Sequence, residues 1–223
     1  MQKTIKVEYK VFSTLFAIKR ELKRIEATYT EVSFDIETRS IYDKENRKLA
    51  KEVNHDVTDI EEENTLSLIT NASGLSHPSI VRTTHVILGL STDESVVFVI
   101  DDKLEQFLFD WLVNTDLKII IHNATFDLKM VHHRTGKFPK DFEDTQQLAK
   151  SIINDCNNYH SRTGLKLLVG KYFPPKWAMK EDTDYEVANL KDEDFLLYCA
   201  IDGAATLLLY RLLKDTINEK EEE

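Results

Sequence analysis

The stretch EVSFDIE, from Glu31 to Glu37, alternates apolar and polar residues and is therefore expected to form a β-strand. Asp35 and Glu37 lie two residues apart, so the pleat of a strand points both carboxylates to the same face of the sheet. Two like charges on one face repel each other and are costly to bury, unless a cation lies between them or one of them takes a proton. The pattern alone leaves two interpretations open: a metal site, or the solvent-exposed face of an edge strand.

Outward from this strand, the chain shows the alternating signals of an α/β protein. Two β-branched runs, at 84–91 and 95–101, are separated by a short Thr-Asp-Glu turn and predict a hairpin. Three strands followed by alternating strands and helices predict a mixed β-sheet flanked by helices. A further short strand is expected at 118–121, and helical periodicity predicts helices at 12–27, 104–113, 124–133, 145–153, 165–172 and 192–217.

The chain is predicted to form one main domain with attachments. Residues 1–30 are assigned to an N-terminal helical extension, whose helix either packs on the core or docks a partner. The main domain spans 31–217 and carries a polar insertion at about 40–82, which lacks sustained periodicity and whose purpose the sequence leaves open. Residues 218–223 are assigned to an acidic tail.

Composition indicates an ordinary globular protein, with 42% hydrophobic and 30% charged residues. Cys156 and Cys199 are too few for a disulfide framework, and no signal peptide or membrane-spanning run is recognised. We therefore expect a cytoplasmic protein, of a bacterium or a phage-infected host, with no membrane partner. The formal net charge of −10 predicts weak affinity for nucleic acid, unless some carboxylates bind divalent cations that draw phosphate in.

Two further clusters contain carboxylates near the ends of predicted elements. Asn123 or Thr125 could cap the helix that follows the strand at 118–121, and Asp127 would lie in its first turn, where the helix dipole favours a negative charge. Tyr198 and Asp202 are four residues apart in the last helix and share one of its faces. Each cluster alone is compatible with a purely structural role.

In combination and in this order, the three clusters resemble the three exonuclease motifs of the DnaQ-like superfamily: D-x-E on a first strand, N-x-x-x-D at a strand-to-helix junction and Y-x-x-x-D in a late helix. The tyrosine of the third motif resembles the DEDDy subgroup, which includes the proofreading domains of bacterial and phage family A DNA polymerases. The segments FEDTQQLAKSII and LKLLVGKY are similar to the intervening segments of that family, so the resemblance covers residues 32–213. It implies an RNase H-like fold.

The resemblance also implies a mechanism with two divalent ions, Mg²⁺ or Mn²⁺, which oxygen ligands favour over zinc. Asp35, Glu37 and Asp202 would bind the first ion, and Asp35 would bridge to a second that Asp127 helps to hold, largely through water. Tyr198 would orient the attacking water. The implied reaction removes nucleoside 5′-monophosphates from the 3′ end of single-stranded DNA, as the proofreading subunit or domain of a replication polymerase. The resemblance therefore also implies a protein partner, a separate polymerase subunit.

Several neighbouring residues are candidates for contacts with the substrate. Thr38 is expected to donate a hydrogen bond to the end of the bound strand, as the matching residue does in the family. Asn123 is assigned to the same site, and Phe126 either stacks on a terminal base or packs in the core. Two sets are left without a firm role: the histidines, which an all-carboxylate site does not need, and a basic stretch that either meets the substrate or is a solvated helix face. They are His122, His132 and His133, and Arg162, Lys166 and Lys171.

Two alternative functions are kept. One is an exoribonuclease of the same superfamily that trims RNA 3′ ends, since the residues that would sense a 2′-hydroxyl are not apparent. The other is a non-catalytic scaffold that binds nucleic acid or a polymerase. The complete set of four carboxylates and Tyr198 counts against the scaffold, because a pure binder gains nothing from acids near phosphate.

Overall fold

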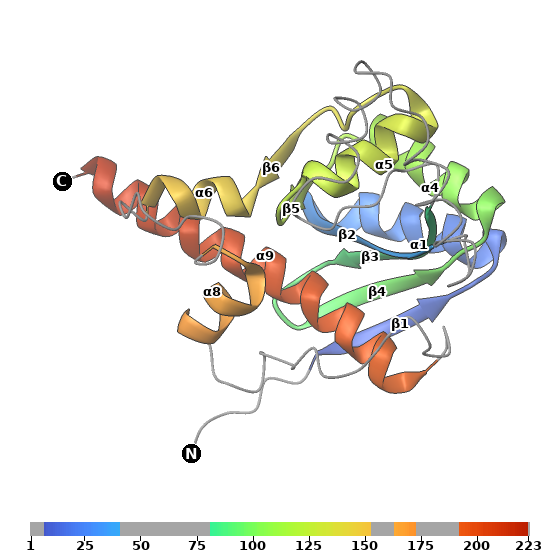
Figure 1. Ribbon diagram of the computed structural model, residues 1–223, viewed down its shortest axis with the longest axis horizontal. Coiled ribbons are helices and arrows are strands. Elements are labelled where there is room, and N and C mark those ends of the chain that lie inside the picture. The colour runs from blue at the N-terminus through green and yellow to red at the C-terminus, as the bar shows by residue number, and fades with distance from the viewer. Residues whose placement is uncertain (1–6, 41–80, 153–162, 173–191, 223) are drawn as a thin grey trace, which may run out of the picture.

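The computed structural model describes residues 7–40, 81–152, 163–172 and 192–222, which form a six-stranded mixed sheet with helices on both faces (Figure 1). The strand order is β1-β4-β3-β2-β5-β6. The strands are β1 (Glu8–Phe12), β2 (Glu31–Ser40), β3 (Val81–Gly89), β4 (Glu94–Val99), β5 (Lys118–Ile121) and β6 (Phe142–Asp144). The helices are α1 (Leu15–Thr28), α4 (Asp102–Asn114), α5 (Thr125–Thr135), α6 (Thr145–Ile152), α8 (Leu165–Tyr172) and α9 (Glu193–Glu222).

The sheet is antiparallel in its centre and parallel towards both edges. β2, β3 and β4 form an antiparallel meander, while β1 pairs parallel with β4, and β5 and β6 continue parallel from β2. This is the mixed α/β architecture that the order of strand and helix signals predicts, and the prediction is confirmed.

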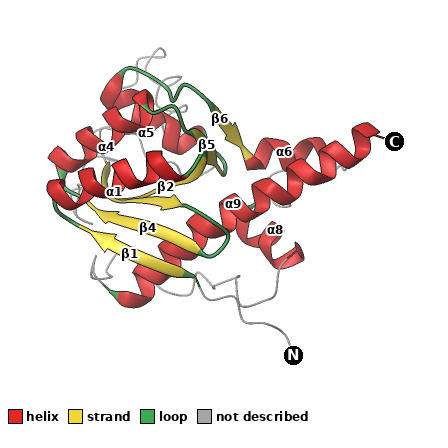
Figure 2. Cartoon of the chain, turned by 180° about the vertical axis from the view of Figure 1, so that it is seen from behind, coloured by secondary structure: helices red, strands yellow, loops and turns green. Residues whose placement is uncertain are grey.

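The two faces of the sheet bury different helices. Alternate residues of β2 and β3, such as Phe34 and Leu88, pack with α1, α4 and α5 in the larger core (Figure 2). The intervening residues, such as Ile87, face α9 and pack against Ala200 and Ala204. Strand alternation thus sends every second side chain of the central strands towards α9.

The N-terminal segment is integrated into the domain, in contrast to the predicted extension. The helix predicted at 12–27 packs on the core as α1, with Ile18 and Ile25 fully buried. The strand β1, which the sequence analysis missed, adds an edge to the sheet beside β4. Most of its side chains are at least partly exposed, so it lacks the apolar run by which a buried strand is recognised. β6 was missed because it has only three residues.

At the C-terminus, α9 is longer than predicted and continues through the acidic segment to Glu222. Its last turns lie beside α6, where Lys214 and Lys118 both pair with Glu143 of β6 (Figure 1). The part of α9 from Glu193 to Glu219 is long and apolar enough to cross a membrane, which the sequence analysis did not recognise, and 61% of its most apolar window is buried. A core helix of a soluble protein passes the same test.

The packing of α9 on the sheet is unusually close at one point. A Cβ at Gly89 of β3 would overlap the carbonyl oxygen of Gly203, and a Cβ at Gly203 would lie 2.8 Å from Cγ2 of Ile87. Two buried hydroxyls fix the helix at this depth: Ser33 donates to the carbonyl of Gly203 at 2.7 Å, and Ser95 to that of Ala200 at 2.8 Å. Only glycines permit this contact between two backbones.

We predict that Gly89→Ala destabilises the protein, because the added methyl group forces α9 away from β3. Overpacking of this kind costs about 3 kcal/mol and should lower Tm by roughly 6–12 °C in a chain of this size. The matched control is Gly170→Ala in α8, where a Cβ meets no atom within 4 Å. The measurement is thermal unfolding of both variants and the parent. Equal Tm values for the two variants would show that the close contact does not constrain the fold.

Candidate active site

Asp35 and Glu37 lie on the face of β2 that is directed towards α9. Their partners across the antiparallel ladder are Ile87 and His85, both fully buried. β2 lies between β3 and β5 in the middle of the sheet, so the alternative interpretation of an exposed edge strand is wrong. Two carboxylates in a central strand have to be compensated, which favours a cation.

The strand β2 is irregular at the acidic pair. Glu37 pairs with His85 but Thr38 pairs with Thr83, which leaves Thr84 in a bulge. The hydroxyl of Thr84 donates to the carbonyl oxygen of Glu37 at 3.2 Å. Bulges change the direction of side chains and are frequent next to active sites. This one lies between Glu37 and Thr38, the residue predicted to contact the end of the substrate.

Asp127 reaches the same region from α5. The parallel pairing of Ser33 with Ile120 ends β5 just before the level of Asp35, so α5 begins beside the acidic half of β2. Asp127 is 5% exposed, and its Oδ1 atom is buried without a hydrogen-bond partner. The backbone of Ile36 opposes the effect of burial by lowering the pKa of Asp127. A buried carboxylate oxygen without a partner is an open ligand position.

The turn before α5 is held by Asp144, not by the residues predicted to cap the helix. Asn123 adopts a left-handed conformation with φ of 58°, and the N-cap residue is Ala124, so the prediction of an Asn123 or Thr125 cap is wrong. The Asp144 carboxylate accepts the backbone N–H groups of Asn123 at 3.0 Å and Ala124 at 3.1 Å, and also that of Gln146 at 2.8 Å. Asp144 therefore fixes the start of α5 and, through it, the position of Asp127.

Sequence reasoning noted Asp144 only as part of a family segment and missed this role. The signal that could have found it is an acidic residue directly before a predicted helix, where its carboxylate can accept backbone N–H groups. The Asp144 carboxylate lies directly before α6 but also accepts a backbone N–H at the start of α5, and no local pattern encodes this tertiary contact.

Tyr198 and Asp202 are placed by the close packing of α9. Tyr198 precedes Ala200 and Gly203, the residues through which the helix contacts the sheet, and Asp202 lies between them in the sequence. The Tyr198 hydroxyl interacts with Asp202, and its ring stacks on that of Phe195 with centroids 6.3 Å apart. Burial, together with the charges of Asp202 and Glu37, raises the pKa of Tyr198 far above its usual value. The phenol is therefore a hydrogen-bond donor at neutral pH.

The pKa values indicate that the predicted carboxylates lie close enough to affect one another. Burial and then the charge of Asp202 raise the pKa of Asp35 to about 7. Burial, Asp35 and Asp202 raise the pKa of Glu37 well above its usual value. Burial and then Asp35 do the same for Asp127. Residues from β2, α5 and α9 thus form one cluster whose members repel one another when ionised.

This cluster has the donor atoms of a divalent-metal site, but its geometry is open. In the described ranges, no three His, Cys, Asp or Glu side chains converge as ligands of one ion. The unpartnered Oδ1 of Asp127 and the all-oxygen donor set match the preference of Mg²⁺ and Mn²⁺.

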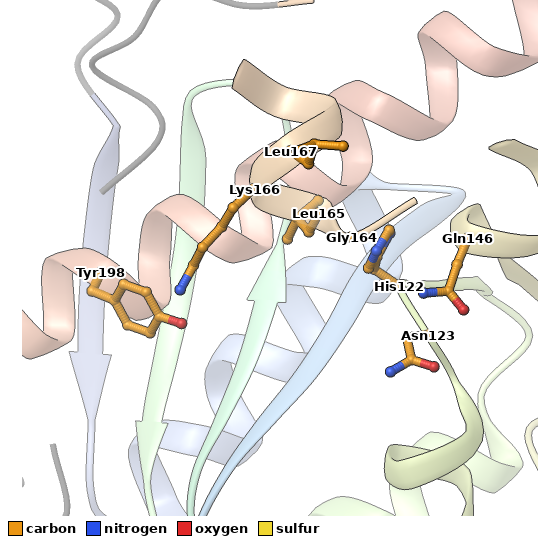
Figure 3. A pocket seen from close by; sticks show the side chains of 8 residues that line it. All are labelled: His122, Asn123, Gln146, Gly164, Leu165, Lys166, Leu167 and Tyr198. Carbon is orange, nitrogen blue, oxygen red and sulfur yellow. The ribbon is translucent and has the colours of Figure 1, made fainter. Parts of the chain in front are cut away.

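A groove of about 610 Å³ adjoins the cluster at Tyr198 (Figure 3). Asn123 lines it, as the prediction of a substrate contact requires. Thr38 lies on β2 beyond the bulge, and Phe126 is partly buried and packs against the larger core. The groove is lined by His122, Asn123, Gln146, Gly164, Leu165, Lys166, Leu167 and Tyr198.

The histidines set aside in the sequence analysis remain outside the carboxylate cluster. Burial lowers the pKa of His122 to about 4, so its ring is neutral; its Nδ1 lies 2.7 Å from the Thr145 hydroxyl. The exposed ring of His132 stacks on Phe138 at 4.6 Å. Arg162, Cys156 and the insertion residues 41–80 lie outside the described residues.

Comparison with known proteins agrees with this architecture. The 3′–5′ exonuclease family model DNA_pol_A_exo1 matches residues 78–218, which include Asp127, Tyr198 and Asp202 but not Asp35 and Glu37. The chain therefore belongs to the DEDDy 3′–5′ exonucleases of the DnaQ-like superfamily, with an RNase H-like fold, and is a metal-dependent 3′–5′ exonuclease. Among curated proteins, none matches the sequence.

Solved structures with the same fold are distant in sequence. NrnC of Brucella melitensis with bound Mg²⁺ has a TM-score of 0.57 at 18% identity, over 98% of this chain and 84% of that one. Escherichia coli RNase D, an exoribonuclease involved in structured RNA processing, has a TM-score of 0.60 at 15% identity, over 93% of this chain and 44% of that one. The RRP6 catalytic core of Trypanosoma brucei has a TM-score of 0.62 at 11% identity, over 98% and 50%.

We predict that metal stabilises the protein more at pH 8 than at pH 5. Because the folded-state pKa values of the three acids are raised, folding takes up protons, and the metal-free protein loses stability as pH rises from about 4 through about 7. Fewer protons have to be displaced from the carboxylates at pH 8 than at pH 5, so at pH 8 Mg²⁺ at about 100 times its Kd should add about 2.7 kcal/mol, or roughly 5–10 °C.

The measurement is the Tm with Mg²⁺ and with EDTA at both pH values, for the parent and for Asp35→Asn, Glu37→Gln. The double variant keeps the shape of both side chains, and we expect it to lose most of the metal effect and to be less sensitive to pH. A metal effect that is equal at the two pH values would contradict a carboxylate site with raised pKa values.

Proposed function

We propose that the chain hydrolyses phosphodiester bonds at the 3′ end of a nucleic acid strand with two divalent ions, Mg²⁺ or Mn²⁺, and releases nucleoside 5′-monophosphates. The observation that carries this proposal is the raised pKa of three carboxylates from β2 and α5, Asp35, Glu37 and Asp127, two of which are also raised by the charge of Asp202 on α9, beside an open groove.

In this proposal Asp35, Glu37 and Asp202 hold one ion, and Asp35 and Asp127 share the other. Ions so placed would clamp the attacking and leaving oxygens of an in-line displacement and acidify a bound water. Tyr198 would not act as a general base, because its phenol stays protonated at neutral pH. It would instead orient the attacking water by a hydrogen bond.

Single-stranded DNA is the first candidate substrate, because the family model that matches the chain is that of the exonuclease of family A DNA polymerases. RNA or a short oligonucleotide is the second, because solved structures of the same fold include ribonucleases and NrnC bound to pGG. The acidic net charge of −10 argues for weak binding of either backbone and for affinity that depends on the bound metal. A cytoplasmic location is part of the same proposal.

The test is degradation of 5′-labelled single-stranded DNA and RNA of one sequence, with Mg²⁺, Mn²⁺ or EDTA. We expect a ladder that shortens from the 3′ end and disappears with EDTA. Asp35→Ala, Glu37→Ala should slow it more than about 10³-fold, since loss of the ions removes several kcal/mol of transition-state stabilisation. Asp116→Asn, an exposed acid paired with Lys140, is the control. Full activity in EDTA, or in the double variant, would contradict the proposed mechanism.

A further inference from the structure

Among the described residues that line the groove beside the carboxylate cluster, Lys166 has the one cationic side chain. His122, which also lines it, is neutral at physiological pH because burial lowers its pKa to about 4. The remaining lining residues are amides, aliphatic side chains, glycine and tyrosine. A phosphate that enters the groove can therefore meet a positive charge from this lining only at Lys166.

Lys166 reaches from α8 towards the carboxylates. α8 is fixed to α9 and α6 by Leu168, which packs with Leu209 and Ala149. The Nζ atom of Lys166 lies 4.8 Å from the centroid of the Tyr198 ring, and Figure 3 shows its stem extending along the groove to that ring. The side chain is partly buried, and its charge favours the ionised forms of Asp35 and Glu37. The ammonium group thus lies against Tyr198 in the groove, close enough to the acidic strand for its charge to act on Asp35 and Glu37.

We propose that Lys166 changes partners during the reaction: it is the counter-ion of the carboxylate cluster when no metal is bound, and it contacts the substrate phosphate when metal is bound. The phosphate half of this inference rests on the proposed exonuclease function. The counter-ion half rests on the position of Lys166 against the Tyr198 ring and on the effect of its charge on Asp35 and Glu37.

The physical reason is competition between cations for the same carboxylates. A divalent ion at Asp35 and Glu37 repels a nearby ammonium group and removes the charge that held it. The flexible four-carbon stem of lysine permits a new position, and the groove next to Tyr198 is where the phosphate of a bound strand would compensate its charge. Lys166 therefore weakens metal binding before the substrate binds. Once the metal is bound, Lys166 and the metal both strengthen binding of the substrate phosphate.

The test compares Lys166→Met with Lys166→Arg, which keeps the charge, and with Lys23→Met, which removes one exposed positive charge on α1, across the sheet. The first measurement is calorimetric titration with Mn²⁺ at pH 8 without nucleic acid. We expect Lys166→Met to bind Mn²⁺ about three- to tenfold more tightly than the parent, and the two controls to bind like the parent.

The second measurement is binding of a nucleoside 5′-monophosphate, which has a phosphate but no bond to cleave, to the Mn²⁺-saturated proteins. Here we expect Lys166→Met to bind the monophosphate at least about tenfold more weakly than the parent does, because the variant lacks a charge-assisted hydrogen bond to the phosphate. The opposite signs of the two effects distinguish this role from a structural one, which would weaken both.

Unchanged or weaker Mn²⁺ binding by Lys166→Met overturns the counter-ion role, and unchanged monophosphate binding overturns the phosphate contact. A parent protein that binds Mn²⁺ but no monophosphate counts against the phosphate contact and the proposed function together. In that case the Mn²⁺ titration still decides the counter-ion role.

Discussion

The close contact between α9 and β3 is the constraint on which the site depends. Gly89 and Gly203 let two backbones approach to a distance that no side chain permits, and the hydroxyls of Ser33 and Ser95 bond to the helix at that depth. Tyr198 and Asp202 belong to the same turns of α9 as this contact, so the packing that closes one face of the core also brings them to the acidic strand. Stability and site geometry thus share one cause.

The second constraint is electrostatic. Asp35, Glu37 and Asp127 are held by elements whose packing is satisfied elsewhere, so their repulsion cannot be relieved by moving the backbone. The metal-free site therefore stores an unfavourable interaction, which protons, Lys166 or divalent cations can compensate. At neutral pH, divalent cations compensate the carboxylate charges best. We therefore expect metal binding to convert the resting site into the active one.

The chain's local patterns were sufficient for the helices and for the strands β2 to β5, because alternation and helical spacing directly report which residues are buried. The four carboxylates were joined into one site only by the resemblance to the exonuclease motifs. Asp35 and Glu37 were recognisable since a pair of acids in an apolar strand is costly without a cation. β1 and β6 were not recognisable, because one is mostly exposed and the other has three residues. The roles of Asp144 and Lys166 depend on contacts between distant elements, and no local pattern encodes them.

The most direct test of the central claim is an anomalous difference map from crystals of the protein soaked with Mn²⁺ at pH 8. The account predicts manganese bound by Asp35, Glu37 and Asp202, with a second ion between Asp35 and Asp127, and Lys166 turned away from the acidic strand. Manganese absent from the carboxylates at saturating concentration, or bound only elsewhere on the chain, would contradict it.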